Sequence, residues 1–285
     1  MKEIRNFQLI TFLSVMLFAG TSSFAQKTIV YKQVDTLRLS MEIYYPPQMN
    51  DSLAYPAMVF FYGGGWVGGR ISHFKPQAKY FSERGIVCFL VDYRTIKKYQ
   101  TTPFECVKDA KSAMRFVRSH ASDYQIDPDK IIASGGSAGG HLAATTALIN
   151  DYNEVTDDLK VSCIPNALVL FNPVFDNGPG GFGYARIGDN YKDFSPLHNI
   201  KKGAPPTIIF LGTKDKHMPV VTAEYYKMVM EKVGSRCELR TYEGQEHGFF
   251  NIYKNAEMYK QTVFEADKFL QSLGFLTEKK NLKIN

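Results

Sequence analysis

A serine surrounded by glycines is the first feature of this chain with clear chemical potential. The stretch ASGGSAGGHLA, residues 133–143, contains a G-x-S-x-G pattern formed by Gly135, Ser137 and Gly139. It joins KIIAS, an apolar run typical of a strand, to AGGHLAATTALI, a run typical of a helix. A sharp strand-to-helix turn exposes its central side chain in a strained conformation, beside the positive end of the helix dipole. We therefore predict that Ser137 is a nucleophile.

A serine hydroxyl is a weak nucleophile unless a neighbouring base removes its proton. Two later strand-like runs are each followed by a suitable group: PTIIFLGT precedes Asp215, and CELRTYEG precedes His247. Because the carboxyl ends of parallel strands meet at one edge of a sheet, both groups are expected near Ser137. His247 would then accept the serine proton, and Asp215 would orient the imidazole and stabilise its charged form.

Other acids and histidines compete for these roles. Asp176 follows the preceding strand-like run and is the alternative acid of the triad. His217 lies two residues after Asp215 and is expected to be a surface neighbour. His141 lies in the helix after the nucleophile and is expected to pack locally. His73 follows no strand end, so it is not predicted to act in the chemistry.

A second glycine-rich stretch, FFYGGGWVGGR at residues 60–70, allows two interpretations. Gly63, Gly65 and Gly68 satisfy G-x-G-x-x-G, the spacing of a dinucleotide-phosphate loop, and Asp92 stands near the position of the acid that such a loop requires. The bulky Trp66 inside the loop and the extra strand pair before it count against this interpretation. The strongest argument against it is that Ser137, Asp215 and His247 already account for the groups at the strand ends.

The favoured interpretation of this stretch is an oxyanion hole. The backbone N–H groups of Gly64 and Gly65, together with that of Ala138, would hold the negative oxygen of a tetrahedral intermediate. Glycine suits this role because the chain must turn sharply and expose its amides to the ligand. Loss of one such donor typically costs about 3 kcal/mol of transition-state stabilisation.

The elements that must position these groups alternate along the chain. An antiparallel pair of strands is expected first, over 28–46, and strands and helices alternate after it. The middle strands are continuously apolar, which is typical of a parallel sheet buried on both faces. The predicted fold is therefore a single doubly wound α/β domain with a mostly parallel sheet and helices on both faces. Strands are expected at 56–62, 86–94, 130–134, 167–174, 206–213 and 237–244, and helices at 72–85, 102–120, 138–149, 219–233 and 255–273.

Composition and targeting signals fit one exported catalytic domain. The 285 residues are 45% hydrophobic and 22% charged, with a net charge of +6 whose basic residues are scattered, so no nucleic-acid partner is expected. Residues 1–25 carry an early basic segment, a short apolar run and small residues before Ala25, the pattern of a signal peptide. Cleavage after Ala25 would leave 26–285 as the catalytic domain, in the periplasm or outside the cell. A retained anchor helix is the alternative, but stable membrane insertion is not expected.

The cysteines suggest neither a metal nor a disulfide framework. Cys88, Cys106, Cys163 and Cys237 form no C-x-x-C pair and no cluster with histidine. Export permits disulfides, but Cys88 lies within an apolar run and Cys237 beside a strand, so buried free thiols are favoured. No metal and no organic cofactor are predicted.

At these motifs the chain resembles the α/β-hydrolase esterases with an HGGG-type loop. YGGGW, GGSAGGH, GTKD and EGQEHGF fall in register with that family over nearly the whole mature chain. Within the family, the chain looks most like exported bacterial acetylxylan and carbohydrate acetyl esterases. Tyr62 stands where the loop usually has a histidine. The resemblance implies that this histidine supports the loop, so Tyr62 would alter loop support or the wall of the acyl site.

The region after the fourth of these strands, 167–174, is expected to form a lid or rim. Glycines alternate there with aromatic residues, of which Phe182, Tyr184 and Tyr191 could stack on a sugar or an aryl group. The alternative is a solvated loop whose aromatic residues only pack. Trp66, beside the oxyanion loop, would either shape the acyl pocket or pack.

The sequence thus predicts a secreted serine esterase that hydrolyses short-chain acyl esters, acetyl esters above all, of small molecules or glycans. The acetyl preference rests on the resemblance. An arylformamidase-like amidase and a peptidase remain enzyme alternatives on the same fold. A hydrolase-fold binding protein without activity is the alternative from another class, disfavoured because all three triad residues are present.

Overall fold

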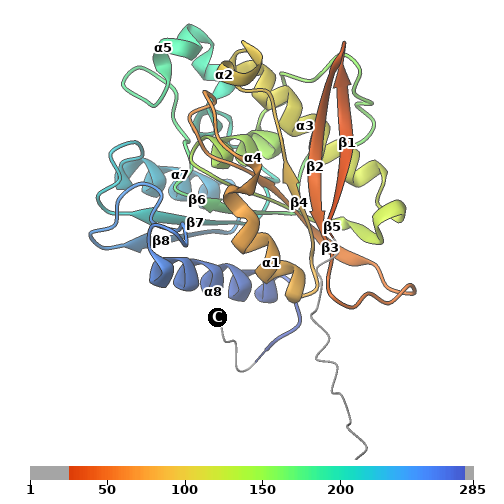
Figure 1. Cartoon of the computed structure of the whole chain (residues 1–285). Helices are drawn as coiled ribbons and strands as arrows, with labels where there is room; N and C mark the ends of the chain where they lie inside the picture. Colours follow the sequence, from red (N-terminus) through yellow and green to blue (C-terminus); the bar gives the residue numbers. More distant parts are fainter. Residues whose placement is uncertain (1–25, 280–285) are drawn as a thin grey trace, which may run out of the picture.

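The computed structural model describes residues 26–279, and its centre is one eight-stranded sheet with the strand order β1-β2-β4-β3-β5-β6-β7-β8 (Figure 1). Strands β3 to β8 are parallel to one another, whereas β2 pairs antiparallel with both β1 and β4. The predicted opening antiparallel pair and the mostly parallel sheet are therefore confirmed. The strands are β1 (Gln26–Val34), β2 (Leu37–Tyr44), β3 (Tyr55–Phe61), β4 (Val87–Val91), β5 (Ile126–Gly136), β6 (Ala167–Phe171), β7 (Thr207–Gly212) and β8 (Cys237–Tyr242).

Helices cover both faces of this sheet, as the doubly wound pattern predicts (Figure 1). One hydrophobic core joins the sheet to α3, α4 and α7, and a second core joins the opposite face to α1 and α8. Side chains along the middle strands alternate between the two cores: Val59 faces the first, and Met58 and Phe60 face the second. The helices are α1 (Lys75–Glu83), α2 (Ile96–Tyr99), α3 (Pro103–Ser119), α4 (Ala138–Leu148), α5 (Tyr184–Ile187), α6 (Tyr191–Phe194), α7 (Val220–Lys232) and α8 (Ala256–Ser272).

Capping residues explain where the long helices begin. Thr102 accepts a hydrogen bond from the Phe104 N–H at the start of α3, and the Glu105 side chain accepts one from the Thr102 N–H, which completes a capping box. Pro103 then occupies the first turn, where a missing N–H costs nothing. Asn255 caps α8 by accepting from the Met258 N–H.

The segment between β6 and β7 departs from tight alternation, as the sequence suggested. It forms the short helices α5 and α6 and the 3-10 turns Gly188–Asn190 and Pro196–Asn199. We call residues 176–195 the flap. Figure 1 shows α5 lying outside the layers formed by the sheet and the long helices.

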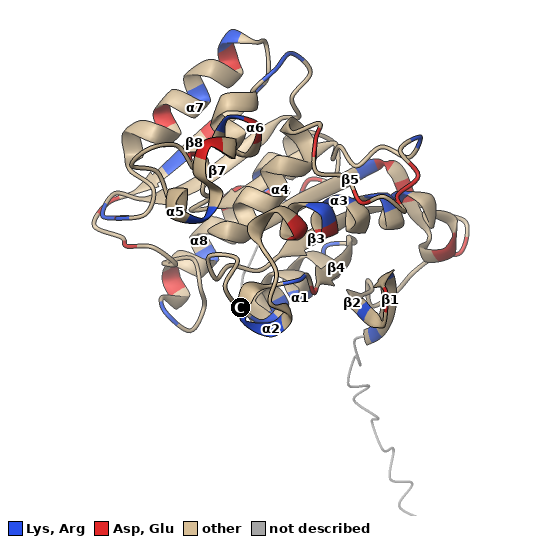
Figure 2. Cartoon of the chain, turned by 90° about the horizontal axis from the view of Figure 1, so that it is seen from above, with Lys and Arg blue, Asp and Glu red and all other residues tan. Residues whose placement is uncertain are grey.

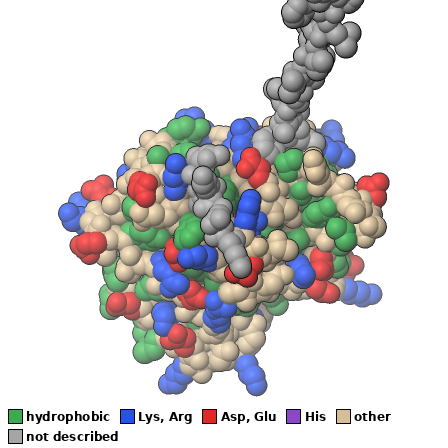
Figure 3. Space-filling model, turned by 90° about the horizontal axis from the view of Figure 1, so that it is seen from below, with side chains coloured by type: hydrophobic (Ala, Val, Ile, Leu, Met, Phe, Trp, Pro, Cys, Tyr) green, Lys and Arg blue, Asp and Glu red, His purple; other side chains and the backbone are tan. Residues whose placement is uncertain are grey.

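Charged residues of both signs are interspersed along the chain (Figure 2), and their side chains are interspersed over the face seen in Figure 3. This distribution accords with a solvated surface. Among residues 26–279, no helix combines the length and the apolar character that are needed to cross a membrane. The four cysteines are buried free thiols, as predicted.

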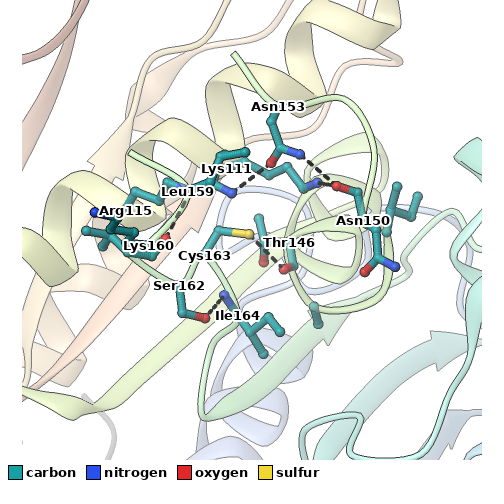
Figure 4. A pocket seen from close by; sticks show the side chains of 13 residues that line it. Lys111, Arg115, Thr146, Asn150, Asn153, Leu159, Lys160, Ser162, Cys163 and Ile164 are labelled. Carbon is teal, nitrogen blue, oxygen red and sulfur yellow. Dashed lines mark hydrogen bonds between the residues drawn. The ribbon is translucent and has the colours of Figure 1, made fainter. Parts of the chain in front are cut away.

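A buried lysine ties α3 to the end of α4 (Figure 4). The Lys111 ammonium donates to the backbone carbonyls of Asn150, at 3.0 Å, and of Asp151, just beyond the carboxyl end of α4. The lysine lines a cavity of about 340 Å³, in which Arg115 bonds Asn153 at 2.7 Å. Because a helix end carries partial negative charge, the ammonium is favourably placed there. Burial nevertheless lowers the pKa of Lys111 to about 8.

We expect Lys111 to make stability depend on pH. Between pH 8 and 10.5 the unfolded chain holds a proton on this amine that the folded chain has released. The cost of burying the charged amine therefore lowers the unfolding free energy fully below pH 8, and this loss becomes smaller as the pH rises. As the pH rises from 7 to 10, the unfolding free energy of the wild type should therefore increase relative to that of Lys111→Met, by at most about 1.4 kcal/mol per pH unit. Urea unfolding at several pH values measures this. The exposed Lys160→Met, in the same cavity, should show a constant difference, and a constant difference for Lys111→Met would contradict the expectation.

Candidate active site

Ser137 occupies a strained turn between β5 and α4. Its backbone angles are φ 56° and ψ −123°, a conformation that is costly for any residue with a side chain. The adjoining backbone approaches closely enough that a Cβ on Gly139 would meet the Phe61 carbonyl oxygen at 2.0 Å, and one on Gly135 would meet the Gly139 oxygen at 2.3 Å. Glycine is therefore required on both sides of Ser137 in the G-x-S-x-G pattern for steric reasons.

Asp215 and His247 meet at the carboxyl ends of β7 and β8. Asp215 Oδ2 lies 2.7 Å from His247 Nδ1, and the carboxylate is completely buried. Its other oxygen accepts the backbone N–H of His217 at 2.8 Å and that of Met218 at 3.2 Å, which fixes the carboxylate in place. These bonds leave Nε2 on the side of the imidazole that faces away from Asp215.

Asp176, the alternative acid, lies elsewhere. Its Oδ1 accepts the Gly178 N–H at 2.8 Å within the flap, so the carboxylate organises that turn. The geometry therefore pairs His247 with Asp215 and not with Asp176.

Ser137 and His247 line the same cavity of about 540 Å³. Three residues that the sequence did not single out line it with them: Asn172, His73 and Asn251. Asn172 directly follows β6 and has a φ of 34°; its amide nitrogen lies 3.4 Å from His247 Nε2, and its oxygen accepts the Gly248 N–H at 2.9 Å. Asn172 thus fixes the loop that carries His247.

The glycine loop after β3 lies beside the Ser137 turn. A Cβ on Gly63 would come within 3.3 Å of the Ser137 Cβ, so the two segments are in direct contact. Gly64 and Gly65 have φ values of 138° and 61°, which side chains rarely adopt. Within residues 26–279, the backbone N–H groups of Gly64, Gly65 and Ala138 donate to no protein acceptor. The loop geometry therefore leaves all three predicted donors available for a ligand.

His73 supports this loop from behind. Its Nδ1 accepts the Gly63 N–H at 3.3 Å, so Nε2 carries the ring proton, and Nε2 lies 2.8 Å from the side-chain amide of Asn251. Burial lowers the pKa of His73, so the imidazole stays neutral and Nδ1 can accept. His73 follows no strand, and its partners are distant in sequence, so only the folded chain reveals its position.

Tyr62 anchors the start of the loop to β4. Its hydroxyl donates towards Asp92 Oδ1 at 3.0 Å and the Tyr93 carbonyl at 3.2 Å, and the Tyr93 hydroxyl donates to the Tyr62 carbonyl at 2.7 Å. The two rings stack with centroids 4.2 Å apart. Burial and the Asp92 charge raise the pKa of Tyr62. Of the two expected effects of this tyrosine, the structure therefore shows loop support.

The aromatic residues proposed to contact substrate occupy three different positions. Phe182 lines the cavity. Trp66 does not: its positive φ of 61° turns the side chain inward, and the indole is fully buried against His141, Phe182 and Phe194. Tyr184 lies outside the cavity lining, and its hydroxyl donates to Asp189 at 3.2 Å.

The remaining histidines lie largely as the sequence suggested. His217 is exposed and packs edge-on against His247, with ring centroids 4.8 Å apart. His141 is fully buried and bonds the Phe194 carbonyl at 3.1 Å. Burial lowers the pKa of His141 to about 3, so this imidazole is neutral and structural. His217 lines the cavity that contains Ser137, whereas His141 does not.

Two family models match consecutive parts of the chain. The BD-FAE model matches residues 41–172, and the model of the prolyl oligopeptidase family matches residues 175–273. The first range contains the glycine loop and Ser137, and the second contains Asp215 and His247.

Curated relatives are similar over most of this chain. The probable isoprenylcysteine alpha-carbonyl methylesterase ICMEL1 of Arabidopsis thaliana is 27% identical in an alignment 264 residues long that covers 83% of this chain and 53% of the relative. The acetylxylan esterase of Xylanibacter ruminicola is 29% identical in an alignment 204 residues long that covers 66% of this chain and 39% of the relative. The chain thus spans between two fifths and about half of the length of these relatives.

Solved structures of Thermogutta terrifontis esterase 2 are similar over nearly the whole of both chains. The form phosphorylated by paraoxon is 43% identical, with a TM-score of 0.85 over 89% of this chain and 96% of that one. The propionate-bound form is 42% identical, with a TM-score of 0.84 and the same coverage.

We expect Tyr62→Phe to loosen the glycine loop. The change removes the one hydroxyl proton that Asp92 Oδ1 and the Tyr93 carbonyl share, so it should lower the unfolding free energy by about 1–3 kcal/mol. Trp66, the only tryptophan of the chain, lies in this loop, so its fluorescence reports urea unfolding at the site itself. Tyr253→Phe is the control, because Tyr253 is 93% exposed. Equal stability of the two variants would show that the Tyr62 hydroxyl does not anchor the loop.

Proposed function

Because this chain belongs to the α/β-hydrolase serine esterases, we propose that it hydrolyses carboxylic esters with Ser137 as nucleophile, His247 as base and Asp215 as the orienting acid. The 2.7 Å contact between Asp215 and His247 carries the assignment, since His247 lines the same cavity as Ser137 and Asp215 is buried behind its imidazole. The strained Ser137 turn and the unpaired N–H groups beside it supply the other parts of such a site.

The reaction follows from these positions. Ser137 Oγ attacks the ester carbonyl while its proton passes to His247 Nε2, and Asp215 stabilises the imidazolium through Nδ1–H. The carbonyl oxygen becomes an oxyanion that accepts from the N–H groups of Gly64, Gly65 and Ala138. Collapse of this intermediate breaks the C–O bond, and the leaving alcohol takes the proton from Nε2. Water then attacks the acyl-enzyme, with His247 again accepting and returning a proton, and the acid is released.

A short acyl group is the favoured substrate class. Structures of the similar Thermogutta terrifontis esterase 2 have propionate or butyrate bound, which supports an acyl site of that size. The similarity to an acetylxylan esterase supports acetyl esters on carbohydrates as the finer proposal. Phe182 at the cavity wall could then contact a sugar or aryl group, whereas Trp66 supports that wall from the core.

Triad variants test the mechanism on p-nitrophenyl acetate, butyrate and octanoate. We expect kcat to fall by at least about 10⁴-fold in Ser137→Ala and by about 10⁴-fold in Asp215→Asn, which holds the imidazole in the wrong tautomer. Rates of the wild type should decrease from the shorter esters to octanoate. Asp176→Asn is the matched control and should retain wild-type rates. If Asp176→Asn loses activity and Asp215→Asn keeps it, the assignment of the acid is wrong; turnover unchanged in Ser137→Ala would overturn the mechanism.

We also propose that the chain is exported and cleaved after Ala25, on the basis of the pattern in residues 1–25. These residues lie outside the described part of the structure. Expression of the full chain in a bacterial host should give a secreted or periplasmic product that begins at Gln26, as determined by N-terminal sequencing and intact mass. A membrane-bound product that retains Met1 would instead support an anchor helix.

A further inference from the structure

The cavity that contains Ser137 has an unusual charge balance. Its lining includes the guanidinium of Arg186 and the imidazoles of His73, His217 and His247, but no aspartate or glutamate among the described residues. The acid that acts here, Asp215, is buried behind His247 and is shared with it. The ionised side chain at the cavity wall is therefore a cation.

Arg186 reaches this position from the flap, where it is the single basic residue of α5. Its Nη1 donates to the Gly65 carbonyl at 2.7 Å, so the side chain bridges the flap and the glycine loop. The guanidinium carbon lies 5.5 Å from the centroid of the Trp66 ring and 5.7 Å from that of Phe182. These rings hold the guanidinium in place through cation–π attraction.

Arg186 has no counter-ion within the described chain, because no carboxylate lies within ion-pair distance of it. Asp189, the acid next to it along the flap, accepts a hydrogen bond from Tyr184 at 3.2 Å. A guanidinium has five N–H donors, and the bond to Gly65 uses one of them. An exposed, immobilised cation with spare donors is suited to a planar anion.

We propose that Arg186 determines specificity for esters that carry a carboxylate close to the scissile bond, on the aryl or sugar part of the substrate. This inference rests on the proposed function and names its substrate class. The carboxylate would bind the remaining N–H groups of Arg186 at the cavity rim, while Phe182 contacts the ring that bears it. The bond to Gly65 O makes Arg186 a support of the glycine loop as well, so the test must separate recognition of charge from loop support.

A matched pair of substrates makes this separation. 4-Acetoxybenzoate and its methyl ester share the acetyl group and the ring, and they differ in one negative charge. The quantity to compare is kcat/KM for the anion divided by kcat/KM for the neutral ester. The two esters differ in intrinsic reactivity by the same factor in every variant, so this factor cancels when the ratio of one variant is compared with that of another. Loss of loop support lowers both rates, whereas loss of charge recognition lowers the ratio.

We expect Arg186→Gln to lower the ratio by about tenfold, which is typical for loss of a charge-assisted hydrogen bond. The loss should appear mainly as a higher KM for the anion. Arg186→Lys should restore part of the ratio, and added salt should lower it in the wild type but not in Arg186→Gln. Lys192→Gln removes one exposed charge from the same flap and is the control that should leave the ratio unchanged. An unchanged ratio in Arg186→Gln, with both rates reduced equally, would overturn the proposal.

Binding measurements decide the matter independently of turnover. Benzoate should quench Trp66 fluorescence at lower concentration than benzamide does, and this preference should vanish in Arg186→Gln. Equal binding of the two ligands by the wild type contradicts the proposal, even if both esters are hydrolysed. Conversely, a preference for benzoate in a protein that hydrolyses neither ester would contradict the proposed function and uphold the anion site.

Discussion

The close approach of two backbone segments at Ser137 is the constraint on which the rest of the site depends. Gly139 lies against the end of β3, where any Cβ would strike the Phe61 carbonyl. This contact compresses the turn and holds Ser137 at a positive φ, at a cost of about 1–3 kcal/mol. Backbone hydrogen bonds offset that cost: the Ser137 N–H donates to Phe171 O at 3.0 Å, and its carbonyl accepts from Val174 at 3.2 Å. The strained conformation of Ser137 is therefore maintained by contacts with both neighbouring strands, β3 and β6.

The order of the strands explains how the other groups reach that turn. β5, which leads directly into Ser137, lies between β3 and β6 in the sheet. β3 leads into the glycine loop, Asn172 directly follows β6, and the next two strands lead to Asp215 and His247. Each strand neighbour thus contributes one part, although the parts span about two thirds of the chain. The parallel arrangement is what collects them at one edge.

This dependence separates what the sequence predicts from what it does not. The Ser137 turn has a local signature, and the strand-end rule then places Asp215 and His247, whose contact the structure contains. His73 and Asn172 were missed because their contacts are non-local: His73 bonds Asn251, 178 residues away, and no spacing in the sequence marks the pair. Trp66 was ambiguous for a related reason, since its direction depends on a backbone angle that the residue types alone do not specify.

The neutral state of His73 explains why the glycine loop can serve two purposes. Because Nδ1 accepts the Gly63 N–H, that donor is used for support and is not available to a ligand. The next two N–H groups, of Gly64 and Gly65, donate to no acceptor within residues 26–279 and so remain free for a ligand. A protonated His73 would present a donor to the Gly63 donor, which would break the support, and the burial that lowers its pKa prevents this. The loop therefore keeps a fixed shape beside a neutral ring, while the positive charge of the cavity is carried by Arg186 at the rim, where it can meet substrate.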